Sequence, residues 1–374
     1  MNRVDSILPS LSRRALECDD VRQVVPESME AITKAGLLKV PQPARTGGYE
    51  MPQRTQGAIV TALSRACAAT GWVYMVMAAH HWCLGTFPEE AQDEVFGSDR
   101  DGLVAGTLSW QGDAQLVKGG FRVNGRWQFA SGVDHSEWVM LGCSERGSHK
   151  PLVHVVIPPN ELEIDDTWFT MGLEGSGSKD VVAHDVFVPT HRTIETRHMF
   201  GGTSPHAQNH RSNLYKLSAE AMLCMSVSNG ILGSAQYGLE SFIDRTKTRK
   251  TILTGSPKAK HLPTQIRAAE AASEINMADS IQQEVFDAFE KLMASGQRFS
   301  VEDRVWAKWQ VSYAAELCRR AINRLWGGSG AHAIYSPNAL QRAFRNINVG
   351  AQHASLDFDS SAEAYGHLLL KADE

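Results

Sequence analysis

The sequence predicts a mainly α-helical protein with a β-domain in the middle of the chain. Helical spacing of apolar residues fills the first and last parts of the chain, and short β-type segments fill the part between them. A length of 374 residues with 43% hydrophobic content is enough for two or three domains with buried cores. We therefore expect an N-terminal helical domain over 1–100, a middle β-barrel or sandwich over 101–195 and a C-terminal four-helix bundle over 210–374.

The first hundred residues show helical patterns. Apolar residues at spacings of three and four predict helix over 12–36. The stretch 53–83 continues the helical pattern with very little charge, so we expect it to be buried. The segment FPEEAQDEVFG predicts a short helix, with Pro88 near its first turn and Gly97 at its end.

The β-type segments are LVAGTLSW, KGGFRVNGRWQFAS, EWVMLGC, PLVHVVIP and DVVAHDVFVP. The turns between them are rich in Gly, Asn and Pro. Asn124-Gly125 predicts a hairpin turn, because this dipeptide favours tight turns between strands. If the apolar residues of the two strands are to lie on one face of the hairpin, a loop of three residues fits better than one of two. The pairing of the two strands is therefore uncertain by one residue.

The last third of the sequence predicts a helical bundle. The polar stretch 201–213 suits a connector, and 214–245 is apolar or small on every side, as expected of a central bundle helix. Apolar stripes predict further helices over 264–293 and 303–326. A final helix is expected from about Asn338 nearly to the end, which makes four.

Composition excludes several function classes. The net charge is −5 and charges of both signs are interspersed, so we expect neither a nucleic-acid partner nor a membrane surface as partner. No window reaches the roughly 18 apolar residues of a membrane span. The six cysteines lack metal-site spacing, so we expect no metal site and a reduced, cytoplasmic setting. No glycine-rich motif of a nicotinamide site occurs between a predicted strand and a predicted helix. The motifs typical of hydrolases, kinases and zinc proteases are also missing.

Three strings resemble segments of the acyl-CoA dehydrogenase fold. They are GRWQFASG (125–132), MGLEGSGSKDVVAHDVFVP (171–189) and WGGSGAHAIYSPNALQRAFRNI (326–347). The order of helical domain, β-domain and bundle is also that of this fold. The resemblance covers nearly the whole chain and implies an acyl-CoA dehydrogenase-like architecture.

The expected catalytic base of an acyl-CoA dehydrogenase, a glutamate, is missing between Gly330 and Asp357. The string NVGAQHASLDFD instead offers His353, and SGVDHSEW (131–138) accompanies it. Both strings resemble two-component flavin monooxygenases of the same fold, among them p-hydroxyphenylacetate, steroid-ring phenol, pigment and indole-acetate hydroxylases. Asn346 departs from the aspartate that this family often has there, which leaves the local bundle contacts open.

This resemblance implies the oxygenase component of a flavin-dependent monooxygenase. In that family a separate NAD(P)H-dependent flavin reductase supplies reduced flavin, FADH2 or FMNH2. The flavin reacts with molecular oxygen, and the resulting C4a-hydroperoxyflavin hydroxylates a small aromatic substrate. The protein must exclude water, because the intermediate otherwise decays by losing hydrogen peroxide. The family resemblance also implies a homotetramer.

The resemblance assigns catalytic roles to three residues. Ser131 is implied to hydrogen-bond flavin nitrogen N5, since a hydroxyl can both donate and accept. His353 is implied to lie over the reacting edge, either taking a phenol proton or orienting the distal oxygen, and its ordinary pKa of about 6.5 suits both. His80 aligns with a substrate-facing histidine of the family. His81 and Trp82 are its neighbours, and one of the two histidines is expected to meet substrate because a buried imidazole is costly unless bonded.

Further residues are implied to bind the cofactor: Phe129, Ser109, Trp138, Ser176, Ser178 and Arg249. Phe129 takes the position of a flavin-stacking aromatic residue. Arg249 matches an arginine that reaches a neighbouring subunit's flavin phosphate. We expect Trp127 in the core and Asp134 and His135 to orient their loop. Each of these assignments competes with a purely structural role, such as a strand serine bonded to backbone or a surface arginine.

Other functions stay open at this stage. An acyl-CoA dehydrogenase with a relocated base, Glu240 or Glu220, is one alternative. A flavin-dependent N-hydroxylase of an amine or amino sugar is another, because it uses the same chemistry. A catalytically silent scaffold of this fold is a third. The sequence does not distinguish FMN from FAD and does not identify the substrate.

Overall fold

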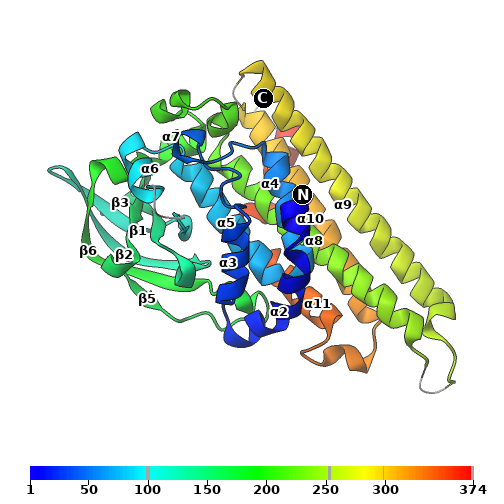
Figure 1. The fold of residues 1–374 in the computed structure, drawn as a ribbon. Helices are drawn as coiled ribbons and strands as arrows, with labels where there is room; N and C mark the ends of the chain where they lie inside the picture. Colours follow the sequence, from blue (N-terminus) through cyan, green and yellow to red (C-terminus); the bar gives the residue numbers. More distant parts are fainter. Residues whose placement is uncertain (98–101, 252–253, 298, 372–374) are drawn as a thin grey trace.

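The computed structural model describes residues 1–97, 102–251, 254–297 and 299–371 (Figure 1). A seven-stranded sheet occupies one end of the molecule, long bundle helices occupy the other, and the N-terminal helices lie between them (Figure 1). The boundary expected at 100/101 lies outside the described residues, and the division into three domains stays a prediction. In the described ranges no helix has the length and apolar character needed to cross a membrane.

The N-terminal helices are α1 Asn2–Asp5, α2 Leu8–Val21, α3 Pro26–Lys34, α4 Gln53–Ala66, α5 Ala68–Leu84 and α6 Glu89–Val95. The helix predicted over 12–36 is two helices, because Arg22 adopts a left-handed conformation and Pro26 begins α3. The run 53–83 is likewise divided, at the extended residue Cys67. Nearly all of α5 is buried, as its lack of charge predicts.

The strands are β1 Val104–Val117, β2 Gly120–Ala130, β3 Trp138–Glu145, β4 Pro151–Ile157, β5 Glu163–Asp165, β6 Lys179–Pro189 and β7 Thr193–Glu195. They form one sheet in the order β5-β6-β2-β1-β3-β4-β7. β1 and β3 pair in parallel and the other neighbours pair antiparallel, so the sheet is mixed. This sheet is the form that the predicted β-domain takes.

The hairpin turn predicted at Asn124-Gly125 is wrong. β1 and β2 pair from Val117 with Gly120 onwards, so the turn is at Lys118-Gly119. Asn124 and Gly125 lie inside β2, where the register with β6 shifts. The expected loop of three residues therefore does not occur either.

A β-bulge explains why this dipeptide occurs within a strand. Gly125 has φ +141°, and a Cβ there would lie 2.5 Å from the Cα of Gly112 on β1. The Asn124 side chain accepts a hydrogen bond from the backbone N–H of Asp185 on β6 (2.7 Å). The residues that signal a turn thus permit a close approach of two strands.

The C-terminal helices are α7 Thr196–Gly201, α8 Ala219–Thr248, α9 Leu262–Ser295, α10 Val301–Gly327, α11 Ala339–Gly350 and α12 Phe358–Leu370. The single final helix predicted from Asn338 is therefore wrong, since α11 and α12 are separate. Between these two helices, the backbones of His353 and Asp357 are not helical. The His353 side chain accepts a hydrogen bond from the Ser355 N–H, and the Asp357 side chain accepts one from the Ser360 N–H. His353 thus lies in the non-helical segment between α11 and α12.

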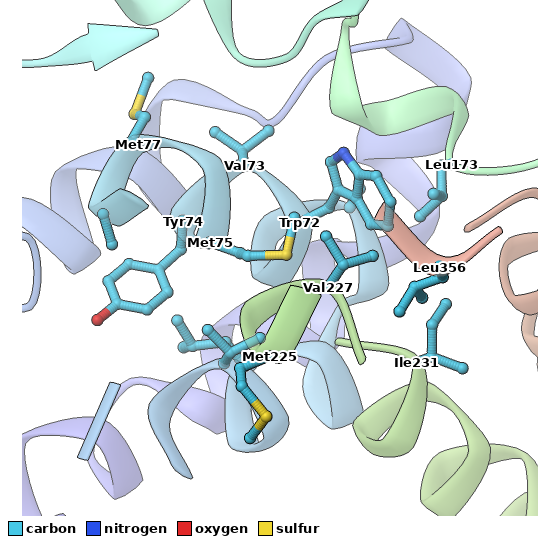
Figure 2. Close-up of a cluster of buried hydrophobic side chains, with 14 of the residues drawn as sticks. Trp72, Val73, Tyr74, Met75, Met77, Leu173, Met225, Val227, Ile231 and Leu356 are labelled. Carbon is cyan, nitrogen blue, oxygen red and sulfur yellow. The ribbon is translucent and has the colours of Figure 1, made fainter. Parts of the chain in front are cut away.

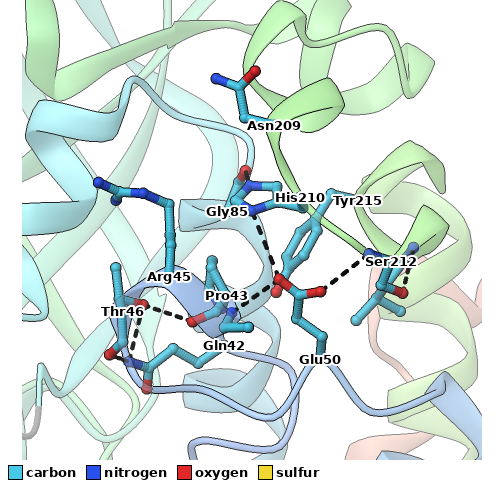
Figure 3. A network of polar contacts seen from close by, with 12 residues as sticks. Gln42, Pro43, Arg45, Thr46, Glu50, Gly85, Asn209, His210, Ser212 and Tyr215 are labelled. Atoms are coloured by element: carbon cyan, nitrogen blue, oxygen red, sulfur yellow. Dashed lines mark hydrogen bonds and ion pairs between the residues drawn. The ribbon is translucent and has the colours of Figure 1, made fainter.

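Polar contacts fasten the connector 201–213 to the N-terminal region (Figure 3). The Glu50 carboxylate accepts hydrogen bonds from the backbone N–H groups of Ala44 (2.9 Å) and Ser212 (3.1 Å). It also lies 3.8 Å from Nδ1 of His210, whose Nε2 donates to the carbonyl of Gly85 (2.6 Å). The connector is therefore held against the C-terminal end of α5.

Candidate active site

Ser131 lies directly after β2 and takes part in a chain of buried hydroxyl groups. Its Oγ accepts a hydrogen bond from the indole Nε1 of Trp72 on α5 (3.1 Å). The same oxygen lies 2.7 Å from Oγ of Ser178, which lies 2.8 Å from Oγ of Ser176. All three serines are buried. Sequence reasoning named the three serines separately, and the structure brings them together.

Glycine lets the Ser131 loop sit directly on α5. Gly132 has φ +74°, and a Cβ at this position would lie 2.6 Å from the Val73 side chain. The Gly132 N–H donates to the carbonyl of Ser176 (3.0 Å). Asp134 and His135 hold the same loop, as predicted: Asp134 pairs with Lys179 (2.8 Å) and the ring of His135 bonds the Val24 carbonyl (2.7 Å).

His353 meets the same tryptophan from the bundle side. The rings of Trp72 and His353 are 5.7 Å apart and inclined by 68°, in an edge contact. Nδ1 of His353 accepts a hydrogen bond from the Ser355 N–H (3.1 Å), so the neutral ring carries its proton on Nε2. Loss of surrounding water lowers the pKa of His353 to about 4. At neutral pH the side chain therefore presents an N–H donor.

Apolar side chains surround Trp72 (Figure 2). Leu173 from the β-domain, Ile231 from α8 and Leu356 from the segment after His353 lie around Trp72 and are buried. No charged group occurs among the side chains labelled there. Burial of this apolar surface keeps water away from one side of the Ser131–Trp72–His353 group.

Helix α11 fixes the loop that precedes Ser176. The side-chain Oδ1 of Asn346 accepts a hydrogen bond from the Leu173 N–H (2.8 Å). Its neighbour Arg345 pairs with Glu174 (2.6 Å) and donates to the carbonyl of Met171 (2.9 Å). The departure at Asn346 thus keeps a defined contact, because an amide oxygen can accept this bond.

Phe129 is exposed at the end of β2 in an unusual conformation. Its φ is +69°, which a bulky residue adopts only at an energetic cost, and 57% of the residue is accessible. Its ring meets that of Trp168 at 6.1 Å and 89°. A strained backbone that presents an aromatic ring to solvent indicates a binding surface. The Trp168 indole is itself fixed, donating to the Leu173 carbonyl (3.0 Å).

Ser109 on β1 is connected to this surface through glutamine. The Gln111 amide donates to Oγ of Ser109 (2.9 Å), and its carbonyl oxygen accepts from the backbone N–H of Gln128 (2.7 Å). Gln128 immediately precedes Phe129. Two hydrogen bonds through Gln111 therefore connect Ser109 to the residue next to the exposed Phe129 ring.

His80 and His81 lie farther along α5 and are fully buried. In the described part of the chain, none of their ring nitrogens has a hydrogen-bond partner of normal geometry. Burial lowers the pKa of His80 to about 3 and that of His81 to about 4, so both rings are neutral. The His81 ring packs against Phe96, with centroids 5.1 Å apart.

His154 on β4 is a buried residue that sequence reasoning missed. Its proximity contributes to the lowered pKa of His80, and burial lowers its own pKa to about 4. Its two nitrogens contact the Leu108 carbonyl (3.1 Å) and the Thr196 hydroxyl (3.2 Å). The available signal was a polar residue in the apolar strand PLVHVVI. Trp72 is the other missed residue, and the available signal was its place in the string GWVYMVMAAHHW, which resembles the family.

Three predicted site residues have contacts outside the chain of serine hydroxyls. Trp82 is buried, donates to the Leu214 carbonyl (3.0 Å) and stacks on Tyr215. Trp138 is buried beneath Arg192, and its indole N–H has no partner among the described residues. Arg249 follows α8 at the end of the bundle remote from the sheet (Figure 1), and its guanidinium bonds the carbonyl of Ser329. The expectation that Trp127 belongs to the core is confirmed.

The glutamates of the acyl-CoA dehydrogenase alternative are engaged elsewhere. Glu240 pairs with Arg65, and Glu220 pairs with Lys308 (3.1 Å). Both carboxylates are partly exposed to solvent. These contacts give neither glutamate the environment of a base poised above a buried substrate, so the alternative loses its support.

Comparisons with known proteins agree with this geometry. Two family models match, the acyl-CoA dehydrogenase N-terminal domain over 9–96 and the acyl-CoA dehydrogenase C-terminal domain over 225–358. The flavin-dependent monooxygenase oxygenase subunit HsaA of Rhodococcus jostii (strain RHA1) is 33% identical over 370 residues, which cover 98% of this chain and 97% of that protein.

Two further proteins extend the comparison. The oxygenase component of FADH(2)-dependent resorcinol hydroxylase from Rhizobium sp. (strain MTP-10005) is 29% identical, and the match covers 99% of this chain and 93% of that protein. The crystal structure of 3-HSA hydroxylase from Rhodococcus sp. RHA1 superposes with a TM-score of 0.93 at 31% identity, covering 99% of this chain and 96% of that one. The predicted acyl-CoA dehydrogenase-like fold is thereby confirmed.

Proposed function

The chain belongs to the oxygenase components of two-component flavin-dependent monooxygenases, and on this premise we propose that it hydroxylates a phenol-like ring with FADH2 and molecular oxygen. Similarity to a resorcinol hydroxylase named for FADH2 supports both the substrate class and the choice of FAD over FMN. The structural observation that carries the proposal is the shared contact of Ser131 and His353 with Trp72.

The surface around Ser131 fits a flavin. Phe129 offers an exposed aromatic ring, braced by Trp168. Ser131 keeps one hydrogen-bonding direction after its contacts with Trp72 and Ser178. We assign Phe129 and Trp168 to contact with the ring system and Ser131 to nitrogen N5. Bound reduced flavin supplies the electrons with which molecular oxygen is split between substrate and water.

Ser109 and Trp138 keep their proposed roles as flavin contacts on neighbouring strands. Ser109 adjoins the Phe129 surface through Gln111. Trp138 offers an indole N–H that no described group uses. Arg249 is proposed to bind the flavin phosphate of an adjacent subunit, which suits its place at the bundle end and the planar guanidinium.

His353 acts as a hydrogen-bond donor in this proposal. The bond from the Ser355 N–H occupies Nδ1, and the lowered pKa keeps the ring neutral at pH 7. Of the two roles expected from the sequence, orienting an oxygen atom through Nε2–H fits this state. Taking a phenol proton would require the Ser355 contact to break.

His80 is proposed to bind the substrate hydroxyl. Its ring nitrogens are buried without a hydrogen bond of normal geometry to the described residues, and an external hydroxyl would relieve the cost of that burial. It lies eight residues after Trp72 on α5, about 12 Å along the helix axis. His81 is the alternative contact, and Trp82 then supports the pocket wall from within the core.

The remaining proposals concern partners and location. A separate NAD(P)H-dependent reductase supplies the flavin, as the term oxygenase component implies for relatives. A homotetramer is supported by exposed apolar residues at the end of α12, Leu369 and Leu370, and by the proposed role of Arg249. A cytoplasmic location is supported by six free, buried cysteines.

Chemically reduced FAD, oxygen and a panel of phenols test the proposal without any reductase or nicotinamide. We expect a hydroxylated product in an amount that rises with enzyme concentration, and none when the enzyme is omitted. Consumption of all reduced flavin as hydrogen peroxide, with no hydroxylated product from any phenol, would contradict the proposed function.

A further inference from the structure

Two cysteine thiols from different helices meet beside the segment that carries Ser176. Cys18 lies on α2, Cys67 lies between α4 and α5, and both are buried and free of any disulfide. Gly175 lies between the two backbones, since a Cβ there would be 2.8 Å from the Cys18 backbone and 2.9 Å from the Ala69 Cβ at the start of α5. The two thiol groups interact directly with each other.

The surroundings of Cys67 favour a negative charge on its sulfur. Cys67 precedes the first turn of α5, and its sulfur accepts a hydrogen bond from the Thr70 hydroxyl (3.1 Å). Interaction with Cys18 lowers the pKa of Cys67, burial opposes the shift, and the Thr70 hydroxyl adds to it. The same interaction raises the pKa of Cys18, so the shared proton stays on Cys18. The negative charge of Asp19, next to Cys18, is offset by a buried ion pair with Arg342 (3.0 Å).

The other four cysteines differ from this pair in their ionisation. They are Cys83, Cys143, Cys224 and Cys318, all buried, and burial raises the pKa of each thiol. The thiolate is the form that reacts with peroxide. Oxidation should therefore select Cys67 among the six cysteines.

We propose that Cys18 and Cys67 form a modification site, in which hydrogen peroxide converts the two thiols to a disulfide. The Cys67 thiolate attacks one oxygen of hydrogen peroxide, so the O–O bond breaks, an S–O bond forms and hydroxide leaves. The Cys18 sulfur then displaces hydroxide from this sulfenic acid as the S–S bond forms. The two thiol protons convert the two hydroxides to water, and the two thiols supply the two electrons that reduce the peroxide.

The proposed flavin reaction produces this oxidant close to the pair. Flavin that reacts with oxygen but does not hydroxylate a substrate releases hydrogen peroxide. Cys67 precedes Trp72 by five residues, about 7.5 Å along the axis of α5, and Gly175 connects Cys18 to Ser176. Only this link to turnover rests on the proposed function, because the pair can also react with added peroxide. Cellular thiols reverse such a disulfide, which suits a cytosolic protein.

Hydrogen peroxide added to the reduced full-length protein without flavin tests the modification. After the remaining thiols are blocked, peptide mass spectrometry should show one disulfide joining Cys18 to Cys67, with two of the six thiols lost. Retention of all six thiols, or oxidation that falls on the other four cysteines, would overturn the inference. The peptide map uses the wild-type protein, so its result does not depend on the folding of any variant.

Three variants assign the roles within the pair. In Cys18→Ser, Cys67 should stop at the sulfenic acid, which dimedone traps. Thr70→Val nearly keeps the shape of the side chain but removes the donor to Cys67, so oxidation should slow about fivefold, the factor for one lost hydrogen bond. Cys224→Ser is the matched control, since it removes a buried thiol outside the pair and should leave disulfide formation unchanged. An unchanged oxidation rate in Thr70→Val, or no trapped sulfenic acid in Cys18→Ser, would contradict these roles.

A second experiment tests the link to turnover. Reduced FAD and oxygen are supplied without phenol, and catalase removes peroxide from the bulk solution. The same disulfide should still form, because the peroxide arises beside the pair. Its absence, with the added-peroxide result intact, would remove the link to turnover and leave the modification site standing. Failure of the proposed function is seen separately, as the absence of hydroxylated product when phenol is present.

Discussion

The two halves of α5 hold buried polar groups that differ in one respect. Near its start, Trp72 donates to Ser131, whose hydroxyl continues to Ser178 and Ser176. Near its end, the four ring nitrogens of His80 and His81 are buried, and none makes a hydrogen bond of normal geometry with the described residues, although backbone groups of Val76, Leu38 and Gly102 lie close enough to influence their pKa values. A satisfied network holds its members in place, whereas unsatisfied buried groups raise the free energy of the empty site.

This difference suggests a division of work along one helix. The bonded half positions the groups that face the flavin, and its geometry is complete before any ligand binds. The unbonded half gains most from a ligand, because a substrate hydroxyl can satisfy a nitrogen that the protein leaves open. Variants at His353, which contacts Trp72 in the bonded half, and at His80 and His81 in the unbonded half should therefore have different effects.

The largest effect is expected at His353. Substitution His353→Ala removes the Nε2–H donor and should lower the rate of product formation at least about 100-fold, within the range for a positioned proton-handling group. The reduced flavin should then be consumed mainly as hydrogen peroxide. Product and peroxide per reduced FAD, measured together, report this change in coupling.

An exposed histidine provides the matched control for that substitution. His149 lies in the turn between β3 and β4, away from Trp72. His149→Ala should retain wild-type coupling. Undiminished product formation in His353→Ala would remove His353 from the mechanism.

A smaller effect is expected at the unbonded half of α5. Leucine has nearly the volume of histidine, so His80→Leu should keep the packing while removing both nitrogens. We expect KM for the phenol to rise about tenfold, the worth of one hydrogen bond to a buried group, with FAD affinity unchanged. Steady-state kinetics at saturating reduced FAD measures it.

His81→Leu is the paired variant and decides between the two histidines. If His80 meets the substrate, His81→Leu should leave KM within about twofold of wild type. The reverse pattern would transfer the substrate contact to His81. Loss of KM effects in both variants would contradict a substrate contact on this half of the helix.

The smallest effect concerns stability against pH. His80, His81 and His154 have pKa values lowered to about 3, 4 and 4 in the folded protein, below the unfolded value of about 6.5. The unfolded chain therefore binds protons that the folded chain does not. Their contribution to stability is complete above pH 6.5 and is lost as pH falls toward about 4.

Urea unfolding at pH 7.5 and pH 5 measures this loss. Each buried histidine should contribute about 1–2 kcal/mol to the decrease in the free energy of unfolding between these pH values. His81→Leu should therefore lose about 1–2 kcal/mol less than the wild type. An identical pH dependence in the two proteins would mean that His81 is not buried in its neutral form.

The sequence predicted the order of elements well, because burial and periodicity are local signals. It failed where one residue type serves two structures. Asn124-Gly125 favours a tight turn, but the same freedom of Gly125 allows β2 to approach Gly112 on β1. That contact joins residues distant in the sequence, so no local pattern reveals it.

The candidate site shows the same limit. Resemblance selected Ser131 and His353, yet Trp72, the residue that contacts both, received no role, although it belongs to the stretch GWVYMVMAAHHW that the resemblance also covers. The break after α11 was missed for a related reason, since His353 and Asp357 suit either a helix or its caps. Their roles depend on the contacts of their side chains with the following N–H groups.

A crystal structure of the protein with bound FAD would test the central claim most directly. The account predicts Oγ of Ser131 within about 3.2 Å of flavin N5, the Phe129 ring against the isoalloxazine, and Nε2 of His353 directed toward the same flavin edge. A flavin bound elsewhere, or N5 separated from Ser131 by more than a hydrogen bond with His353 turned away, would contradict it.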